Sequence, residues 1–491
     1  MKKWVGILGL ICCFSASWSQ EKQYPDTADI PTKSIRPEFV RYESNFIHHA
    51  SSLQPFFQSL KRLESLEENQ VSIFHFGDSH IQADGFSGVV RTELQKKYGS
   101  VGRGLVFPYR LAKTNHPRDL FSQTNTLWQS KRNIIYFPDF PTGLMGYGVK
   151  TTDPNFVFKI GTKTFNGIEN SFDRIWLFHA NGPEQFDYLL LKTEEGKPIE
   201  IWENERVPLT HRVGRKETVL TVAKQYKISA SWIKKTNRLK SNTLKPGFEI
   251  IVGYSNSKQP KVVNGKSTME PLGFISSNDG SPRPWNRTLI ELGEPMSEVT
   301  FGGLKTKASQ REAHLFGLVM ENSEASGIAY HTTGVNGAQL PHFVKSDFFL
   351  DQAIALQPKL VLVSLGTNEA FDNNLDTLAW ARNIDTLVAR IRAGVPGVCF
   401  LFTTPPDSWK GGYPRPLLEA ISRTLYRKAE ELDFAVWDFR EVMGGKGSMK
   451  TWNRARLAQD DLVHLTQTGY NLQGFLLIEA LERAQKETYD H

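Results

Sequence analysis

The strongest constraint on the fold is an alternation of short apolar runs with amphipathic stretches in the last third of the chain. KLVLVSLG (359–366) and GVCFLFTTPP (397–406) each precede a longer segment whose apolar residues recur at helical spacing. A continuous apolar run is typical of a strand that is covered on both faces, and the neighbouring helices supply that cover. The sequence therefore predicts an α/β domain of three layers, with a parallel sheet between two layers of helices.

The same pattern begins much earlier in the chain. VSIFHF (71–76) is an apolar run that ends in a Gly-Asp turn and precedes another helical stretch. Beyond it, aromatic and β-branched runs are separated by Gly, Pro, Asn and Asp, which is typical of antiparallel strands. We therefore expect an α/β domain in two parts, 66–110 and 326–491, interrupted by a β-rich, sandwich-like insertion at 111–325.

The N-terminus has the composition of a secretory signal. Two lysines precede the apolar run WVGILGLICCF, and small residues follow it, so we expect residues 1–19 to be a signal peptide. Residues 20–65 are expected to form an extended N-terminal segment. The apolar run is too short for an ordinary membrane span, and no later run is long enough. The sequence therefore predicts an exported protein, periplasmic, cell-surface or secreted, with no integral membrane segment after signal removal.

Charge and cysteine content add weaker constraints. The formal net charge of +7 over 491 residues is compatible with a polyanionic partner such as cell wall, and equally with an ordinary soluble protein. We expect no nucleic-acid partner. Of the three cysteines, only Cys399 lies outside the predicted signal, in an apolar strand where an inert, buried thiol is expected. The exported protein would then have no intramolecular disulfide.

Ser79 lies just past the first predicted strand, in FGDSH, and just before a helix. The carboxyl ends of strands in an open α/β sheet form the ligand crevice, and a helix N-terminus favours negative charge. A serine hydroxyl becomes a nucleophile when a base takes its proton and a third group orients the base. In DDLVHLT, His464 offers the base and Asp461 the orienting carboxylate. Asp460 is the rival carboxylate, one residue out of that spacing.

An ester hydrolase also needs donors for the oxyanion, and three are available by residue type. They are the backbone N–H of Ser79, the backbone N–H of Gly337 in TTGVNGAQ, and the side-chain amide of Asn368 in LGTNEA. Each residue alone has an ordinary structural explanation: a helix cap for Ser79, a turn for Gly337, and a loop amide bonded to its own backbone for Asn368. Their order, with each beside a predicted strand end, favours a catalytic serine site.

A metal site is the competing interpretation of the same segment. GDSH is similar to the Gly-Asp-x-His of metallophosphoesterases, in which the aspartate and histidine bind metals. That chemistry needs further ligands, including an Asn-His pair after a later strand. The corresponding place here reads Gly-Thr-Asn-Glu, without histidine. We therefore expect no metal and no other cofactor.

Taken together, these segments resemble the SGNH (GDSL-like) hydrolases over roughly residues 66–105 and 325–488. The residues that correspond to the family's four named residues and its triad aspartate are, in order, Ser79, Gly337, Asn368, His464 and Asp461. The resemblance implies a flavodoxin-like sheet and metal-free ester hydrolysis through an acyl-serine. His80 stands where the commonest form has leucine. GDSHIQADG with GVNGA is more similar to the branch of bacterial peptidoglycan O-acetylesterases and O-acetyltransferases, whose members also carry a carbohydrate-module-like β-sandwich insertion.

Residues 211–253 resemble a LysM module nested in the insertion, with the order strand, helix, helix, strand (βααβ) and many basic residues. LysM modules bind N-acetylglucosamine-containing glycans, chiefly peptidoglycan and chitin. The positions predicted from this resemblance to bind glycan are Asn237, Leu239 and Gly247. The residues expected in its small core are Leu220, Val222, Ala223, Tyr226, Ile228, Ile233, Leu239, Leu244 and Ile250. An arbitrary basic helical pair is the alternative, and whether the module binds glycan or only braces the insertion is open.

Export, a serine-esterase pattern and a glycan-binding module together predict a carbohydrate O-acetylesterase. Its substrate would be the O-acetyl groups of cell-wall glycan, with peptidoglycan as the first choice. Three alternatives stay open. The same residues could transfer the acetyl group to another sugar hydroxyl, or hydrolyse other esters such as acetylated xylan or lipids. The chain could also be a glycan-binding wall protein with a weak or inactive esterase site.

Overall fold

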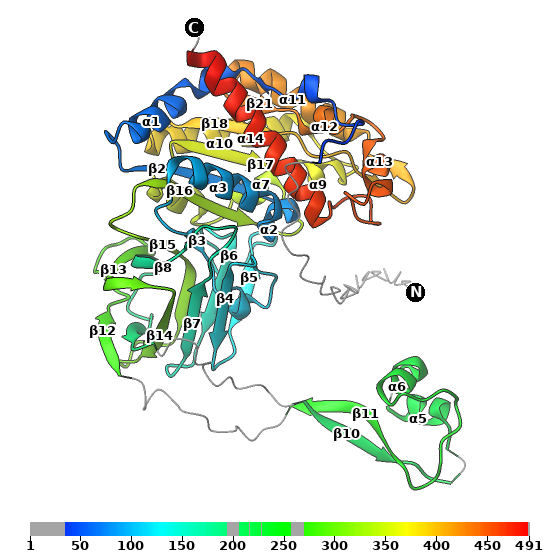
Figure 1. Cartoon of the computed structure of the whole chain (residues 1–491). Helices are drawn as coiled ribbons and strands as arrows, with labels where there is room; N and C mark the ends of the chain where they lie inside the picture. Colours follow the sequence, from blue (N-terminus) through cyan, green and yellow to red (C-terminus); the bar gives the residue numbers. More distant parts are fainter. Residues whose placement is uncertain (1–34, 194–205, 216, 227, 257–269, 490–491) are drawn as a thin grey trace, which may run out of the picture.

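The computed structural model describes most of the chain, and its parts are arranged as Figure 1 shows. The described residues are 35–193, 206–215, 217–226, 228–256 and 270–489. The predicted signal peptide, residues 1–19, lies outside this range. Within the described part of the chain, no helix is both long and apolar enough to cross a membrane.

Five parallel strands and one antiparallel edge strand form the central sheet of the α/β domain, in the order β1-β21-β18-β17-β2-β16. The strands are β1 (Ile47–His48), β2 (Gln70–Gly77), β16 (Gly327–Gly334), β17 (Leu360–Ser364), β18 (Cys399–Thr403) and β21 (Ala435–Trp437). Numbered along the chain, the parallel strands lie in the order 2-1-3-4-5, which is flavodoxin-like. The switch point of such a sheet lies between its first and third strands, here β2 and β17.

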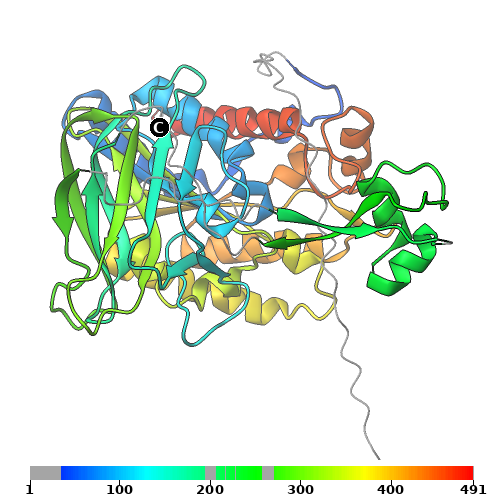
Figure 2. The same cartoon turned by 90° about the horizontal axis from the view of Figure 1, so that it is seen from below.

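Helices cover both faces of this sheet, as predicted. On one face lie α1 (Gln54–Glu64), α3 (Gly85–Tyr98) and α14 (Gln467–Tyr489), and on the other α7 (Leu340–Val344), α8 (Phe349–Ala355), α10 (Thr377–Gly394) and α11 (Leu417–Leu432). Figure 2 shows red α14 and yellow α10 on opposite sides of the strands. Alternate residues of β2 serve the two faces: Val71 and Ile73 join the core under α3, and Phe74 and Phe76 join the core under α10.

The N-terminal segment contains more regular structure than the expected extended segment at 20–65. In its described part, β1 pairs with β21 as an antiparallel edge strand, and α1 packs against α3 and α14. Phe56, Phe57, Leu60 and Leu63 of α1 are all buried, and their spacing is that of one helix face. The central sheet is therefore mixed rather than purely parallel.

The β-rich insertion consists of two antiparallel sheets that share one core. One sheet contains β4 (Leu120–Thr124), β7 (Val157–Thr162), β9 (Asp187–Leu191), β12 (Pro271–Ile275) and β14 (Glu298–Leu304). The other contains β3 (Gly104–Val106), β5 (Gln129–Arg132), β6 (Tyr147–Thr151), β8 (Phe172–Ala180), β13 (Trp285–Met296) and β15 (Ala313–Glu321). Aromatic residues of both sheets, such as Phe158 and Phe178, belong to a single buried cluster.

The insertion begins earlier than the expected residue 111. The short strand β3 already pairs with β15 of the insertion, and the chain returns to the α/β sheet at Gly327. The segment where the chain leaves the α/β domain contacts the segment where it returns, because Ile328 N–H donates to Gly99 O at 2.9 Å. A Cβ on Gly327 would lie 2.1 Å from the carbonyl carbon of Gly99, so only glycine fits there. This close crossing places the ends of the insertion side by side.

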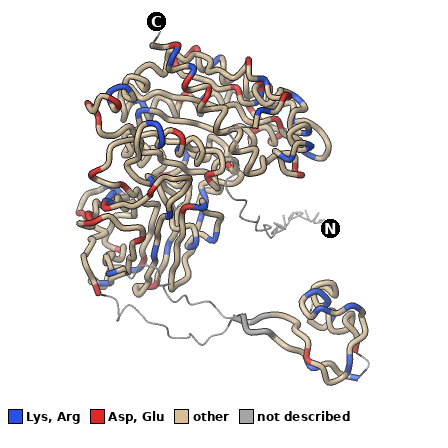
Figure 3. Tube along the Cα trace, viewed as in Figure 1, with Lys and Arg blue, Asp and Glu red and all other residues tan. Residues whose placement is uncertain are grey.

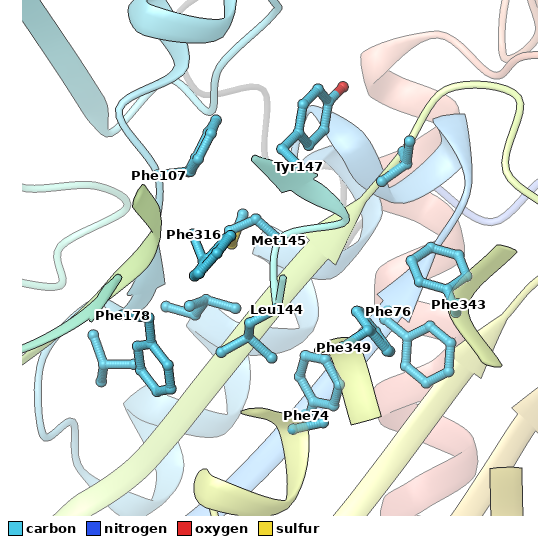
Figure 4. Packing of buried hydrophobic residues seen from close by; sticks show 14 of the residues in the cluster. Phe74, Phe76, Phe107, Leu144, Met145, Tyr147, Phe178, Phe316, Phe343 and Phe349 are labelled. Carbon is cyan, nitrogen blue, oxygen red and sulfur yellow. The ribbon is translucent and has the colours of Figure 1, made fainter. Parts of the chain in front are cut away.

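A continuous apolar core joins the insertion to the α/β domain. Figure 4 shows Leu144, Met145 and Phe316 of the insertion between Phe178 on one side and Phe74 of β2 on the other. All of these side chains belong to one buried cluster. Packed interiors have low compressibility, so the shared core holds the insertion in a fixed position relative to the α/β domain.

The predicted βααβ unit is present at the expected place. It consists of β10 (Arg206–Arg212), α5 (Val219–Tyr226), α6 (Ala230–Thr236) and β11 (Glu249–Asn256), with β10 and β11 antiparallel. It is inserted between β9 and β12, which pair with each other, so its two connections start from neighbouring strands. Figure 3 shows that blue basic residues outnumber red acidic ones in this unit.

Two of the residues expected in the core of this unit are exposed instead. Leu220 is 57% exposed and Tyr226 is 39% exposed, whereas Val219 is buried. Helix α5 begins at Val219, so the inward stripe runs through Val219, Val222 and Ala223 rather than through Leu220. The remaining expected residues pack in or against the cluster, which also includes Val213 and Val252.

Candidate active site

Ser79 is the first residue of the short helix α2 (Ser79–Gln82), directly after the central strand β2. Asp78 caps this helix, and its Oδ1 accepts a hydrogen bond from the N–H of His80 at 3.0 Å. The first N–H groups of a helix have no acceptor within the helix, so the N–H of Ser79 is not used by α2 itself. Strand and helix together hold a half-buried serine at the switch point of the sheet.

The structure brings His464 and Asp461 to Ser79 across most of the chain's length. His464 Nε2 lies 2.9 Å from Ser79 Oγ, and His464 Nδ1 lies 2.7 Å from Asp461 Oδ2. With Nδ1–H donating to the carboxylate, Nε2 is the nitrogen that accepts the serine proton. Asp460 does not compete, because its Oδ1 accepts from Asn453 Nδ2 at 3.3 Å.

A tight loop aims this carboxylate at the imidazole. Asp461 Oδ1 accepts hydrogen bonds from the N–H of Val463 at 2.9 Å and of His464 at 3.0 Å, which leaves Oδ2 for the ring. Burial of the carboxyl raises its pKa, but the hydrogen bonds from the ring and the two N–H groups outweigh burial and lower the pKa of Asp461 to about 2. Asp461 is therefore ionised at any ordinary pH.

The charge of Asp461 acts in turn on the imidazole. Burial lowers the pKa of His464, but the hydrogen bond and negative charge of Asp461 outweigh it, and the pKa of His464 is raised above its ordinary 6.5. A base with a raised pKa holds an abstracted proton more firmly, and must be deprotonated before it can act. The pair is thus set to take the proton of a hydroxyl once the imidazole has lost its own.

Gly337 and Asn368 lie on the loops that follow β16 and β17, the strands on either side of β2. Gly337 has a φ of +80°, which favours glycine. Asn368, in α9 (Thr367–Ala370), donates from Nδ2 to Ala338 O at 2.9 Å and to Asp78 Oδ2 at 3.3 Å. The Asn368 amide is thus held next to both the Gly337 loop and the residue that precedes Ser79.

Sequence reasoning missed Gln82, which ties the loop that carries Gly337 to helix α2. Its Oε1 accepts from the N–H of Asn336 at 2.8 Å, and its Nε2 donates to Thr114 Oγ1 at 2.8 Å. Gln82 therefore fixes the segment that carries Gly337 relative to the helix that carries Ser79. Its place in the sequence, one helical turn after Ser79, indicates neither of these partners.

His80 and Asp78 are buried beside the site, and both have strongly shifted pKa values. Burial lowers the pKa of His80 to about 3, so its ring is neutral, and its Nδ1 lies 3.0 Å from Tyr470 Oη. Burial raises the pKa of Asp78 to about 7, against the hydrogen bond from the His80 N–H. The rings of His80 and His464 are 5.3 Å apart. A neutral His80 fills the space behind the base without adding charge to it.

No group of three or more His, Cys, Asp and Glu side chains within the described ranges is arranged to hold a metal ion. Cys399 is buried, and burial raises the pKa of its thiol to about 11.

The three residues predicted to bind glycan have places in the fold of the βααβ unit. Asn237 accepts from the N–H of Ile251 at 2.7 Å and donates to Ile251 O at 2.8 Å, which fastens the end of α6 to β11. Leu239 packs against the small core, and Gly247 is in a turn with a φ of +83°. Their contribution to glycan binding stays a prediction.

Comparison with known families finds two matches. The model of the GDSL-like Lipase/Acylhydrolase family matches residues 303–472, and the model of the LysM domain matches residues 211–253. The first match includes Gly337, Asn368 and His464 but not Ser79, which lies before the insertion. No curated protein matches the chain.

Comparison with solved structures finds a match over almost the whole chain. A peptidoglycan O-acetylesterase is 20% identical, with a TM-score of 0.60 over 92% of this chain and 99% of the other. A lipase/acylhydrolase from Enterococcus faecalis is also 20% identical, with a TM-score of 0.26 over 32% of this chain and 78% of the other. The first of these shows a shared fold. Together with the family matches, it confirms the resemblances inferred from the sequence.

Proposed function

We propose that this protein is an exported serine esterase that removes O-acetyl groups from cell-wall glycan, with peptidoglycan as its substrate. The observation that carries the proposal is the hydrogen-bonded series from Asp461 through His464 to Ser79. The acylhydrolase family match, the LysM match and the shared fold with a peptidoglycan O-acetylesterase all support it. The basic, lysine-rich LysM unit would keep the enzyme on its polymeric substrate.

In the proposed reaction, Ser79 Oγ attacks the acetyl carbonyl while His464 Nε2 takes its proton. Asp461 keeps the imidazole in the required tautomer and stabilises its positive charge. The bond between the carbonyl carbon and the sugar oxygen then breaks, and His464 returns the proton to that oxygen. Water, deprotonated by His464, attacks the acetyl-serine in the same way and releases acetate. Atoms and charge balance without any redox partner.

The oxyanion of each tetrahedral intermediate would be bound by the N–H of Ser79, the N–H of Gly337 and the Asn368 side chain. Asn368 Nδ2 must give one hydrogen to the substrate for this role. Of the two hydrogen bonds that Asn368 Nδ2 donates, the bond to Asp78 Oδ2 is the longer, at 3.3 Å, and therefore the weaker. It is the bond that a hydrogen bond to the substrate would replace. The shorter bond to Ala338 O would keep the amide in place during the exchange.

The experiment that tests this function measures two products from one incubation. Wild type and Ser79→Ala are each mixed with O-acetylated and with de-acetylated peptidoglycan, and an added chitooligosaccharide serves as acceptor. The proposal predicts free acetate only from wild type with the O-acetylated polymer. Acetylated chitooligosaccharide would show an acetyltransferase instead. Neither product, with retention on the insoluble polymer, would show a glycan-binding wall protein.

A further inference from the structure

A basic groove adjoins the candidate active site on the side of the β-sandwich. It is a cavity of about 600 Å³ between β5, the loop after β5, and the loop that carries Gly337. That volume is within the roughly 300–1,000 Å³ of clefts that bind small ligands. The lining residues that matter for the argument are Lys113, Thr114, Lys131, Arg132, Phe137 and Asn336.

The groove is connected to the site by hydrogen bonds rather than by proximity alone. Asn336 precedes Gly337, and its carbonyl oxygen accepts from Arg132 Nη1 at 3.2 Å. Thr114, on the opposite wall, is bonded through Gln82 to the N–H of the same Asn336. The lining of the groove therefore extends to the residue next to Gly337, the proposed oxyanion donor.

All the charge on the groove's lining residues is positive. Lys113, Lys131 and Arg132 are cationic, and none of the described residues that line the cavity is a carboxylate. Lys131 Nζ lies 3.8 Å from the centre of the ring of Phe137, which also lines the groove. Arg132 is exposed, and its guanidinium group hydrogen-bonds both to Asn336 O and to the side chain of Tyr147, another lining residue of the groove.

Apolar residues form the rest of the wall. Ile134 and Phe137 line the cavity, together with Ile135, whose side chain is 59% exposed at the rim. An exposed isoleucine beside an aromatic ring suits the apolar face of a pyranose or the side chains of a peptide. Cations beside such a surface favour a ligand that carries an anionic group in addition to its apolar part.

We propose that the basic groove binds a carboxylate on a branch of the same acylated sugar chain whose ester lies at Ser79. In peptidoglycan this would be a carboxylate of the peptide that branches from the acetylated sugar. The inference rests on the proposed function, since it takes Ser79 as the position of the ester. The β-sandwich thus supplies part of the substrate site, and the enzyme prefers acetylated glycan that carries an anionic branch over neutral acetylated glycan.

A paired-substrate experiment tests this preference within one enzyme sample. The first substrate is an O-acetylated muropeptide, and the second is the same molecule with its peptide carboxylates converted to neutral amides. The measured quantity is the ratio of kcat/KM for the free acid to kcat/KM for the amide. The double variant Lys113→Gln, Lys131→Gln should lower this ratio about fivefold, because it removes two partly exposed cations from the groove.

The matched control removes two lysines that do not line the groove. Lys96→Gln with Lys486→Gln gives the same change in net charge at exposed positions of α3 and α14, and should keep the wild-type ratio. A wild-type ratio of one, or an unchanged ratio in the groove variant, would overturn the groove and leave the proposed esterase function intact.

An acetylated oligouronate, with its carboxylates on the sugar rings, separates the two sources of the anion. One outcome is that wild type cleaves this probe and not the muropeptide, with the groove variant cleaving the probe less well than the control does. That result would support anion binding in the groove and would exclude peptidoglycan as the substrate. If wild type releases acetate from neither probe, the proposed function fails and the groove proposal fails with it.

Discussion

The identity of single side chains decides the chemistry of the site, and Asp461 is the most informative of them. It is three residues from His464 in sequence, and its two oxygens have separate tasks. One oxygen is held by the N–H groups of Val463 and His464, and the other accepts from the imidazole at 2.7 Å. Its charge is what raises the pKa of His464 above 6.5 against the effect of burial.

Replacing that charge should change both the rate and its pH dependence. In wild type, we expect kcat/KM to rise with pH as His464 loses its proton, and the raised pKa of His464 should place the midpoint above the ordinary 6.5. Asp461→Asn removes the charge that raises this pKa, so the midpoint should move to lower pH. The variant should also lose about 10³-fold in kcat/KM, because the amide no longer fixes the tautomer. The measurement is a pH–rate profile on a small acetate ester.

The neighbouring carboxylate provides a matched control for this experiment. Asp460→Asn makes the same chemical change one residue away, at a side chain that faces Asn453. Its profile should coincide with that of wild type. An acid limb that stays in place in Asp461→Asn would mean that another group titrates in the reaction.

At the scale of elements, a buried charged cluster joins helix α3 to the start of the insertion. Asp84, just before the helix, and Arg91 within it contact Arg103 and Asp119, which lie on the other side of the crossing at Gly99. Arg91 Nη2 is 2.9 Å from Asp119 Oδ2, and Arg103 Nη2 is 2.8 Å from Asp84 Oδ2. All four side chains are at most 5% exposed. The cluster fixes where the insertion leaves the α/β domain.

Breaking this cluster should lower the free energy of unfolding much more than breaking a surface ion pair. Asp119→Ala leaves two buried guanidinium groups with half of their counter-charge, and should lower the free energy of unfolding by about 3–5 kcal/mol. Glu482→Ala, which removes the exposed partner of Lys97, should lower it by less than about 1 kcal/mol. Urea denaturation of both variants measures the difference. Equal effects would contradict the assignment of the cluster as a buried network.

The same cluster has a defined pH dependence. Burial raises the pKa of Asp119, but Arg103 and Arg91 outweigh it and hold the pKa below the ordinary 3.8. A carboxyl with a lowered folded-state pKa stabilises the fold above its unfolded pKa, and this stabilisation is lost as the pH falls through the folded value. The stability gap between wild type and Asp119→Ala should therefore shrink below pH 3.8 and be constant above it.

The elements that could be predicted from the sequence are those whose burial produces a simple pattern of apolar residues. The strands at β2, β17 and β18 are continuous apolar runs because both of their faces are covered. Strand β16, GIAYHTTG, does not form such an apolar run, because its polar side chains are satisfied by distant partners. Thr333 Oγ1 donates to Met145 O at 2.8 Å, and Tyr330 Oη lies 2.9 Å from His75 Nδ1. No local pattern contains that information.

The candidate active site shows the same difference between residues with a local sequence pattern and residues with distant partners. The proximity of Ser79, Asp461 and His464 could be predicted because serine-esterase chemistry would require those residue types beside strand ends. Gln82 and Tyr470 could not, because they act by holding neighbours that are hundreds of residues away in the sequence. The same is true of the basic groove. Its walls come from the insertion and from the loop after β16, which only the fold brings together.

At the scale of the whole molecule, the LysM unit has a hydrophobic core of its own. Its small core shares no residue with the two large clusters. Its strands β10 and β11 are paired at their outer ends, Arg206 with Asn256, so the chain enters and leaves at one place. The unit can therefore be removed with little effect on the remainder, in contrast to the sandwich that carries it.

Deletion of residues 206–256 should separate substrate binding from catalysis. The shortened protein should hydrolyse a small soluble acetate ester at the wild-type rate, because the deleted residues belong to none of the elements that hold the triad. It should lose most of its retention on insoluble peptidoglycan in a sedimentation assay. Ser79→Ala should behave in the opposite way. Full retention after the deletion would show that the LysM unit only braces the insertion.

The most direct test of the central claim is to trap the covalent intermediate. Wild type is mixed with an acetate ester, quenched in acid within the first turnover, digested, and analysed by mass spectrometry. The account predicts one acetyl group on the peptide that contains Ser79, and neither acetylation nor ester hydrolysis in Ser79→Ala. Hydrolysis that persists in Ser79→Ala, or an acetyl group on another residue that forms and decays at the turnover rate, would contradict it.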